Sequence, residues 1–202
     1  MPTVLKKSGR MASVATAKKP LVNDLIQALD SPVARERFSA AKALRMLSEA
    51  EPQTLYSYFD VLAKGLDSQN SFLRWDATRT LANLASEDRQ QKLDALLDRL
   101  LESIPGPQMI GAATAIAAAA NVALAKPYLA DRIAAAILEV RTAKYQTAEC
   151  HHIAVGHAIE SLGRFLQLVQ DRRPVIRFVR AQIENPRAAT RRKAETFLRR
   201  WS

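Results

Sequence analysis

The sequence predicts an all-α fold, an α-α superhelix (solenoid) of about five helix pairs, and three observations point to it. A segment near the N-terminus repeats further along, apolar residues recur at helical spacing, and no alternating strand pattern interrupts them. Only 6 of the 202 residues are glycine, too few for a loop-rich β protein. The single cysteine, Cys150, excludes an internal disulfide and is typical of a reducing compartment.

The clearest repetition pairs residues 28–47 with residues 65–84. The two stretches share a leucine, an Asp-Ser pair, an arginine, an aromatic residue and two further leucines at matching positions. Apolar residues at the same spacing precede each stretch, over 21–29 and 55–66, so each unit is a helix A and a helix B joined by a polar turn. The turn aspartate is expected to cap helix B.

Weaker units continue this pattern along the rest of the chain. A third runs over 86–125, and two more open at Pro127 and near Pro174, where the fixed φ of proline suits the start of a helix. Helix pairs that repeat about every 40 residues cannot bury their apolar faces alone, so neighbouring pairs must stack. Residues 20–202 are therefore predicted to form one solenoid, preceded by a flexible basic arm over 1–19.

The segments RFSAAKAL and RWDATRTL, each following a turn aspartate, resemble the HEAT repeat family over roughly nine-tenths of the chain. The resemblance implies a helical solenoid and indicates little about activity. It also implies a ladder of turn aspartates and helix arginines, represented by Asp30 and Arg37 in the first unit. Met109 and His152 stand at the arginine position of the third and fourth units, so we expect the ladder to be broken there.

Phe38, Trp75 and Ile110 align in the first three units and are predicted to be core positions. The Trp75-Asp76 pair is similar to the Trp and Asp of HEAT-like alkylpurine DNA glycosylases, but adjacent residues point about 100° apart on a helix and would not share a pocket. The chain has no nucleophile motif and no phosphate-binding loop. It is predicted not to be an enzyme and to need no cofactor; base excision or metal-dependent oxygenation is the enzymatic alternative.

The three histidines lie close together in the sequence: His151, His152 and His157. Two of them are three residues from a glutamate, so each pair shares a helix face. A di-iron site would need a second such motif with further carboxylates, and a zinc site would need three or four convergent ligands. We therefore interpret the histidines as ordinary residues of a B helix, and metal binding stays the alternative.

The net charge of +10 is distributed unevenly along the chain. Residues 1–20 contribute +5 and residues 163–202 contribute +8, whereas residues 21–162 contribute −3. The candidate binding residues are the basic side chains of the last unit: Arg173, Arg177, Arg180, Arg192, Lys193, Arg199 and Arg200. Such a surface binds acidic proteins or phosphates, and the alternative is an end cap that prevents solenoids from stacking end to end.

The sequence therefore predicts a non-enzymatic scaffold that binds a protein partner through its concave or basic C-terminal surface, with no small-molecule substrate. The alternative is a nucleic-acid-binding solenoid with phosphate contacts from residues 1–19 and the last repeat. The uncharged stretch 103–125 is rich in alanine and opens with prolines, so no membrane span is predicted. We expect a cytoplasmic location, or an organellar one if residues 1–19 act as a transit peptide.

Overall fold

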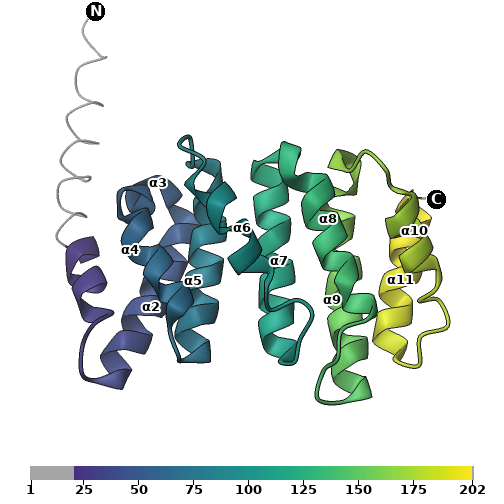
Figure 1. The fold of residues 1–202 in the computed structure, drawn as a ribbon, viewed down its shortest axis with the longest axis horizontal. Coiled ribbons are helices and arrows are strands. Elements are labelled where there is room, and N and C mark those ends of the chain that lie inside the picture. Colours follow the sequence, from purple (N-terminus) through teal and green to yellow (C-terminus); the bar gives the residue numbers. More distant parts are fainter. Residues whose placement is uncertain (1–20, 202) are drawn as a thin grey trace, which may run out of the picture.

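The computed structural model describes residues 21–201, and in this range it consists of helices and turns with no strand. The helices form antiparallel pairs that stand side by side in chain order (Figure 1). The all-α solenoid predicted from the sequence is therefore confirmed. The arm predicted over residues 1–19, and the transit-peptide alternative for it, lie outside the described residues.

The second, or B, helix of each pair is long and continuous: α2 (Ala34–Ala50), α5 (Ser71–Asn83), α7 (Met109–Ala125), α9 (Ala148–Phe165) and α11 (Ala188–Trp201). Short 3-10 turns, η3 (Leu84–Ser86) and η6 (Leu166–Leu168), extend α5 and α9. The continuity of the B helices makes them the regular element along which the pairs can stack.

The first, or A, helices are shorter, and two of them are divided by 3-10 turns. They comprise residues 21–28; α3 (Pro52–Leu55), η1 (Tyr56–Tyr58), α4 (Phe59–Ala63) and η2 (Lys64–Asp67); α6 (Lys92–Leu101); η4 (Pro127–Leu129), α8 (Ala130–Leu138) and η5 (Glu139–Arg141); and α10 (Arg173–Arg180). Proline is the first or second residue of α3, η4 and α10, as predicted, because an N–H at that position has no partner inside the helix.

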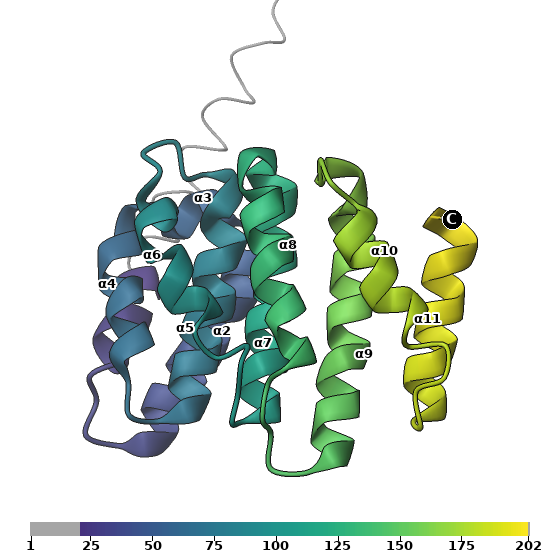
Figure 2. The ribbon, with the colours of Figure 1, turned by 45° about the vertical axis from the view of Figure 1, so that its right-hand side comes forward.

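The B helices pack on one another in sequence, α2 on α5, α5 on α7, α7 on α9 and α9 on α11, and this B layer is covered on one side by the A helices (Figure 2). The core lies between the two layers and between successive pairs, with Leu44, Leu81, Ile116 and Leu162 fully buried. Six of the seventeen residues of α7 are buried alanines, which allow its neighbours to approach closely. None of the helices within residues 21–201 combines the length and apolar character needed to cross a membrane.

Three positions predicted to be core are partly exposed, so that prediction is wrong. Phe38 is 37% exposed, Ile110 is 52% exposed and Trp75 is half-buried. The buried residues of α2 are Ala40, Ala41, Leu44 and Ser48. The buried face of α2 is therefore rotated from the predicted one. The helical spacing of apolar residues favoured the large side chain of Phe38 for the core, whereas most of the buried residues of α2 are small.

The arginines of the repeated motif hold the turns between helices A and B. Arg37 donates a hydrogen bond of 2.6 Å to the carbonyl oxygen of Ser31, six residues earlier. Arg74 makes the corresponding bond to the carbonyl of Ser68. Arg191 does the same in the last pair, with a bond of 2.7 Å to the carbonyl six residues before it. Each arginine thus satisfies a backbone acceptor that the turn leaves free.

The aspartate–arginine ladder expected from the family resemblance is wrong. Asp67 pairs with Arg99 on the next A helix rather than with the arginine of its own turn. Helix α5 is capped by Asn70, whose side-chain oxygen accepts a 3.0 Å hydrogen bond from the backbone N–H of Phe72. The turn aspartates therefore leave helix capping to other side chains.

The alignment of the third and fourth pairs is also corrected by the helix boundaries. The motif arginine is the fourth residue of its B helix, a position held by Ala112 in α7 and His151 in α9, and not by Met109 and His152. His151 Nε2 lies 2.9 Å from the carbonyl oxygen of Val140, which belongs to η5 at the end of the preceding A helix.

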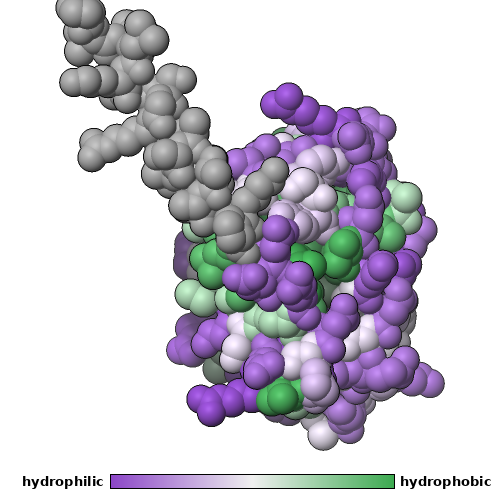
Figure 3. Space-filling model, turned by 90° about the vertical axis from the view of Figure 1, so that its left-hand side faces the viewer, coloured by the Kyte–Doolittle hydropathy of each residue, from purple (hydrophilic) through white to green (hydrophobic). Residues whose placement is uncertain are grey.

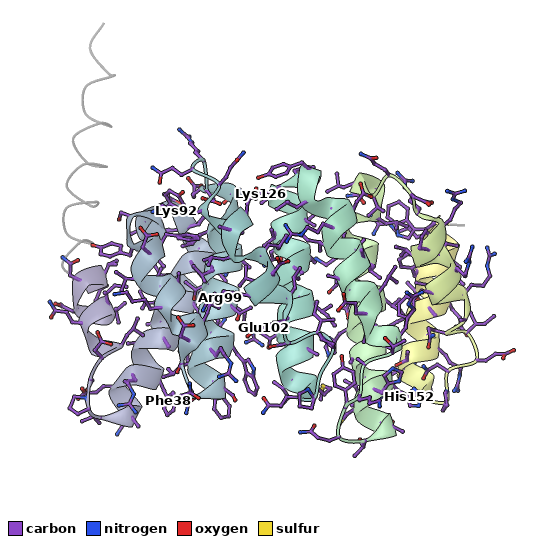
Figure 4. The ribbon with its side chains drawn as sticks, in the orientation of Figure 1. Phe38, Lys92, Arg99, Glu102, Lys126 and His152 are labelled. Carbon is purple, nitrogen blue, oxygen red and sulfur yellow. The ribbon has the colours of Figure 1, made fainter. Side chains whose placement is uncertain are left out.

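A buried ion pair, Asp88–Lys126, joins successive helix pairs at the edge of the solenoid opposite Phe38, where α7 ends (Figure 4). The Asp88 side chain is fully buried, Lys126 is 5% exposed, and Lys126 Nζ lies 3.0 Å from the Asp88 carboxylate. Lys126 also lies 2.8 Å from Asp94, and the hydroxyl of Tyr56 donates a 2.7 Å hydrogen bond to Asp88. Every buried charge in this cluster therefore has a partner.

Burial raises the pKa of Asp88, but hydrogen bonds from Tyr56, the backbone N–H of Leu93 and Lys126 outweigh it, so the net pKa lies below its usual value. The folded protein therefore binds fewer protons at this group than the unfolded chain does. The stability that Asp88 contributes is present at neutral pH and is lost as the pH falls through its folded-state pKa.

We expect Asp88→Ala to lower the free energy of unfolding by about 3 kcal/mol at neutral pH, because it leaves Lys126 buried without one of its carboxylates. The control is Asp60→Ala, which removes the exposed partner of Lys92 and should cost less than about 1 kcal/mol. Urea unfolding measures both losses. Equal losses in the two variants at neutral pH, or a loss for Asp88→Ala that persists undiminished in acid, would contradict this account.

Candidate partner-binding surface

Polar side chains connect the B helices along the side of the B layer that faces away from the A helices. Asn83 donates a 3.0 Å hydrogen bond to Ser48, and Asn121 donates one of 3.0 Å to Asn83. Arg164 continues the series with a 2.7 Å bond to Asn121. These contacts fix the register of four successive B helices, and they hold the Arg164 guanidinium at the border of the last repeat.

A groove of about 540 Å³ lies in that last repeat, between α9 and α11. Its apolar lining includes Gly163, Phe197 and Trp201, and its polar lining consists of Glu160, Arg164, Arg192, Lys193, Thr196 and Arg200. A Cβ atom on Gly163 would lie 3.2 Å from the Phe197 ring, so the glycine is what allows α11 to pack this close to α9. The groove therefore combines an apolar lining with a basic rim.

The charges of the groove are unequally satisfied. Lys193 Nζ pairs with Glu160 at 2.6 Å, and this hydrogen bond lowers the pKa of Glu160. The Arg200 guanidinium lies 4.8 Å from the ring centre of Trp201. Arg192 makes no hydrogen bond or ion pair within residues 21–201. Because Glu160 is the one acid of the lining and is already paired, the groove presents net positive charge.

The structure divides the seven candidate basic residues. Three line the groove: Arg192, Lys193 and Arg200. Three are exposed on the A helix of the same pair: Arg173, Arg177 and Arg180. Arg173 pairs there with Asp171 at 2.8 Å, and Arg199 on α11 donates a 3.0 Å hydrogen bond to Thr196. The seven residues therefore lie on two helices of the last pair, α10 and α11, and three of them line the groove.

The groove includes residues that were not among the sequence candidates. Arg164 belongs to the preceding B helix, so its place beside α11 follows from the stacking of pairs rather than from local sequence. Trp201 is half-buried in the groove. Ile183, which follows α10, is 44% exposed. A helix at the end of a solenoid has one neighbour fewer, which leaves part of its apolar face open.

The rings of His151 and His152 pack edge to face, with ring centres 5.8 Å apart, and His151 Nε2 lies 2.9 Å from the carbonyl oxygen of Val140 in η5. The backbone oxygen of His152 accepts a 2.8 Å hydrogen bond from Thr190. His157 lies near the charges of Lys193 and Glu160. The part of the chain that the structure describes contains no group of three or more His, Cys, Asp or Glu side chains placed to hold a metal ion.

Trp75 and Asp76 also contact different neighbours. The Asp76 carboxylate accepts a 3.0 Å hydrogen bond from Arg45 on α2. The indole nitrogen of Trp75 instead faces α7, where a Cβ atom on Gly111 would lie 3.3 Å from it. The resemblance of this pair to the DNA glycosylases therefore does not extend to a shared pocket.

Comparison with solved structures gives two similar folds. The crystal structure of an engineered protein has a TM-score of 0.58 and 18% identity, and the match covers 88% of this chain and 77% of that one. TOG3 of Mini spindles from Drosophila melanogaster has a TM-score of 0.51 and 14% identity, with 87% and 79% covered. No protein-family model matches the sequence, and neither does any curated protein. At these identities the likeness shows the fold alone, which is that of a HEAT-like helical solenoid.

His157 lies near the groove residues Lys193 and Glu160, and its titration makes the stability of the protein depend on pH. Burial lowers the pKa of His157, and the charges of Lys193 and Arg187 lower it further against the opposite effect of Glu160. The folded protein thus binds fewer protons at His157 than the unfolded chain does, so its stability falls as the pH decreases below about 6.5. We expect His157→Gln to make the free energy of unfolding less dependent on pH in this range. Urea unfolding at several pH values measures it, and identical slopes for variant and wild type would contradict the prediction.

Proposed function

We propose that this protein is a helical-repeat scaffold that binds a protein partner through the groove between α9 and α11. The observation that carries the proposal is the union, in one groove, of an apolar lining with a basic rim whose single acid is already paired. Aromatic residues and arginine are enriched at the energetic centres of protein interfaces. Repeat solenoids, moreover, offer extended surfaces formed by successive units.

The chemistry of the groove favours an acidic segment that carries a large apolar side chain. Such a side chain would lie against Phe197 and Trp201, while neighbouring carboxylates would face Arg192 and Arg200. Opposite charges across an interface raise the rate of association and exclude partners of the wrong sign. The net positive charge of the chain acts in the same direction.

Two observations favour a protein over a nucleic acid at this groove. Arg200 lies over the ring of Trp201, so that face of the indole is not free to stack on a base. The basic residues of the last repeat are divided between the groove and α10, whereas a phosphate backbone is followed by a continuous basic stripe. The proposal assigns the protein no catalytic role.

The test reverses the charge of the groove with Arg192→Glu and Arg200→Glu in one chain. The matched control reverses Arg177 and Arg180, which lie on α10 in the same repeat outside the groove. Each tagged protein captures binding partners from an extract treated with nuclease, and mass spectrometry quantifies what is retained. We expect a partner that wild type and control retain equally and that the groove variant retains at least about tenfold less, since charged contacts at an interface are worth about 1.4 kcal/mol or more.

Retention that disappears on nuclease treatment would contradict a protein partner. Equal loss in the groove and α10 variants would show that net charge, and not the groove, determines binding. Thermal unfolding of all three proteins checks that the substitutions, which fall on exposed or half-buried side chains, leave the fold intact.

A further inference from the structure

Apolar side chains reach the surface at the opposite end of the B layer, where the first B helices begin. Phe72 is 65% exposed and Phe38 is 37% exposed, while Trp75 is half-buried beside them. The Phe72 ring centre lies 6.4 Å from that of Phe38 and 5.2 Å from that of Trp75, and both contacts are edge to face. Val33 and Ile110 are 50% and 52% exposed, and they lie at the starts of α2 and α7. We call these five residues the apolar ridge.

The packing of the solenoid does not account for this exposure. The Asn70 cap fixes Phe72 as the second residue of α5, and its ring contacts those of Phe38 and Trp75, which are themselves partly exposed. Figure 3, a view of the N-terminal end, shows hydrophobic areas that reach the surface between hydrophilic side chains. Contiguous exposed apolar patches on soluble proteins mark interaction sites more often than scattered single residues do.

Basic side chains accompany the apolar ridge. Arg35 and Lys42 lie three residues before and four residues after Phe38 on α2, so all three share one face of the helix. Both are exposed, and their side chains make no hydrogen bond or ion pair within residues 21–201. Arg79, four residues after Trp75 on α5, is exposed as well and donates one long hydrogen bond of 3.3 Å, to a threonine of α7.

The acids of the same two helices are already engaged. Glu36 accepts a hydrogen bond of 2.5 Å from Ser31. Glu49 and Asp76 both bind Arg45, at 2.6 Å and 3.0 Å. The Ser31 hydroxyl does not neutralise Glu36, but α2 and α5 together carry six Lys or Arg side chains against three Asp or Glu, so their net charge is positive. An occupant with negative charge is complementary to it.

We propose that the apolar ridge is a second docking surface, which takes an acidic protein segment bearing large apolar side chains. It goes beyond the proposed function, since the ridge shares no residue with the groove between α9 and α11. Apolar side chains of the segment cover the exposed rings, and its carboxylates face Arg35, Lys42 and Arg79. Val33 and Ile110 favour a protein over single-stranded nucleic acid, because bases stack on aromatic rings and gain nothing comparable from aliphatic side chains.

The test uses a random peptide library displayed on phage and selected on the full chain. Each enriched peptide, labelled with a dye, is titrated by fluorescence anisotropy into wild type, Phe72→Ser, Lys42→Glu and the control Ile183→Ser. Ile183 is a matched control because it is an exposed aliphatic residue at the other end of the solenoid. We expect a set of peptides rich in Asp, Glu and large apolar residues whose affinity falls at least tenfold in Phe72→Ser and in Lys42→Glu but not in Ile183→Ser.

The affinity of each peptide is also measured for the variant that carries both Arg192→Glu and Arg200→Glu. This measurement distinguishes ligands of the apolar ridge from ligands of the groove. Peptides that lose affinity only in that variant belong to the groove, so the two sites can fail independently. The proposal is overturned if no enriched peptide depends on Phe72, or if the dependent peptides are basic. It is overturned equally if oligothymidylate binds in a Phe72-dependent manner and displaces them, or if wild type dimerises through the ridge and Phe72→Ser stays monomeric in sedimentation. Unchanged thermal unfolding of Phe72→Ser, expected for an exposed ring, confirms that a loss of binding is local.

Discussion

The stacking of helix pairs is the constraint on which the rest of this structure depends. Each pair has too little apolar surface of its own to fold alone, so every B helix must bury one side against its neighbours and one against its A helix. The alanines of α7 make this possible at the centre of the chain, because small side chains allow close packing from both directions. What remains is one long side of the B layer that nothing in residues 21–201 covers. Both proposed docking sites lie along it, at opposite ends.

The same stacking sorts the charges. Acids of the A helices reach bases on the following pair, in the contacts Asp60–Lys92, Asp67–Arg99, Asp94–Lys126 and Asp98–Arg132. These ion pairs connect one repeat to the next, and they pair many of the acidic side chains of the central repeats with basic ones. Unpaired basic groups then remain on α2, α5, α10 and α11. The unpaired basic groups therefore lie in the first two helix pairs and in the last one.

The fold was predictable because the sequence itself repeats: apolar residues at helical spacing, turn residues and prolines at helix starts recur along the chain. The sites were predictable only in part. The helical spacing placed Arg192, Lys193 and Arg200 on the last helix. The groove that they line also includes Arg164, which comes from another repeat. Spacing also assigned Phe38 to the core, since a period shows which residues share a face and not where the buried face ends. The contacts of the motif arginines with turn carbonyls were not predictable from spacing either, because they depend on the path of the backbone in the turn.

Each proposed site contains one of the two tryptophans of the chain, Trp75 in the apolar ridge and Trp201 in the groove. The central claim, that a protein partner docks on the uncovered side of the B layer, is therefore tested most directly by acrylamide quenching of tryptophan fluorescence. Trp201→Phe isolates Trp75, Trp75→Phe isolates Trp201, and each variant is measured with and without a partner protein free of tryptophan. The account predicts that a partner bound in the groove reduces the quenching of Trp201 and that one bound at the apolar ridge reduces the quenching of Trp75. Unchanged quenching of both, in a complex shown to be formed, would contradict it.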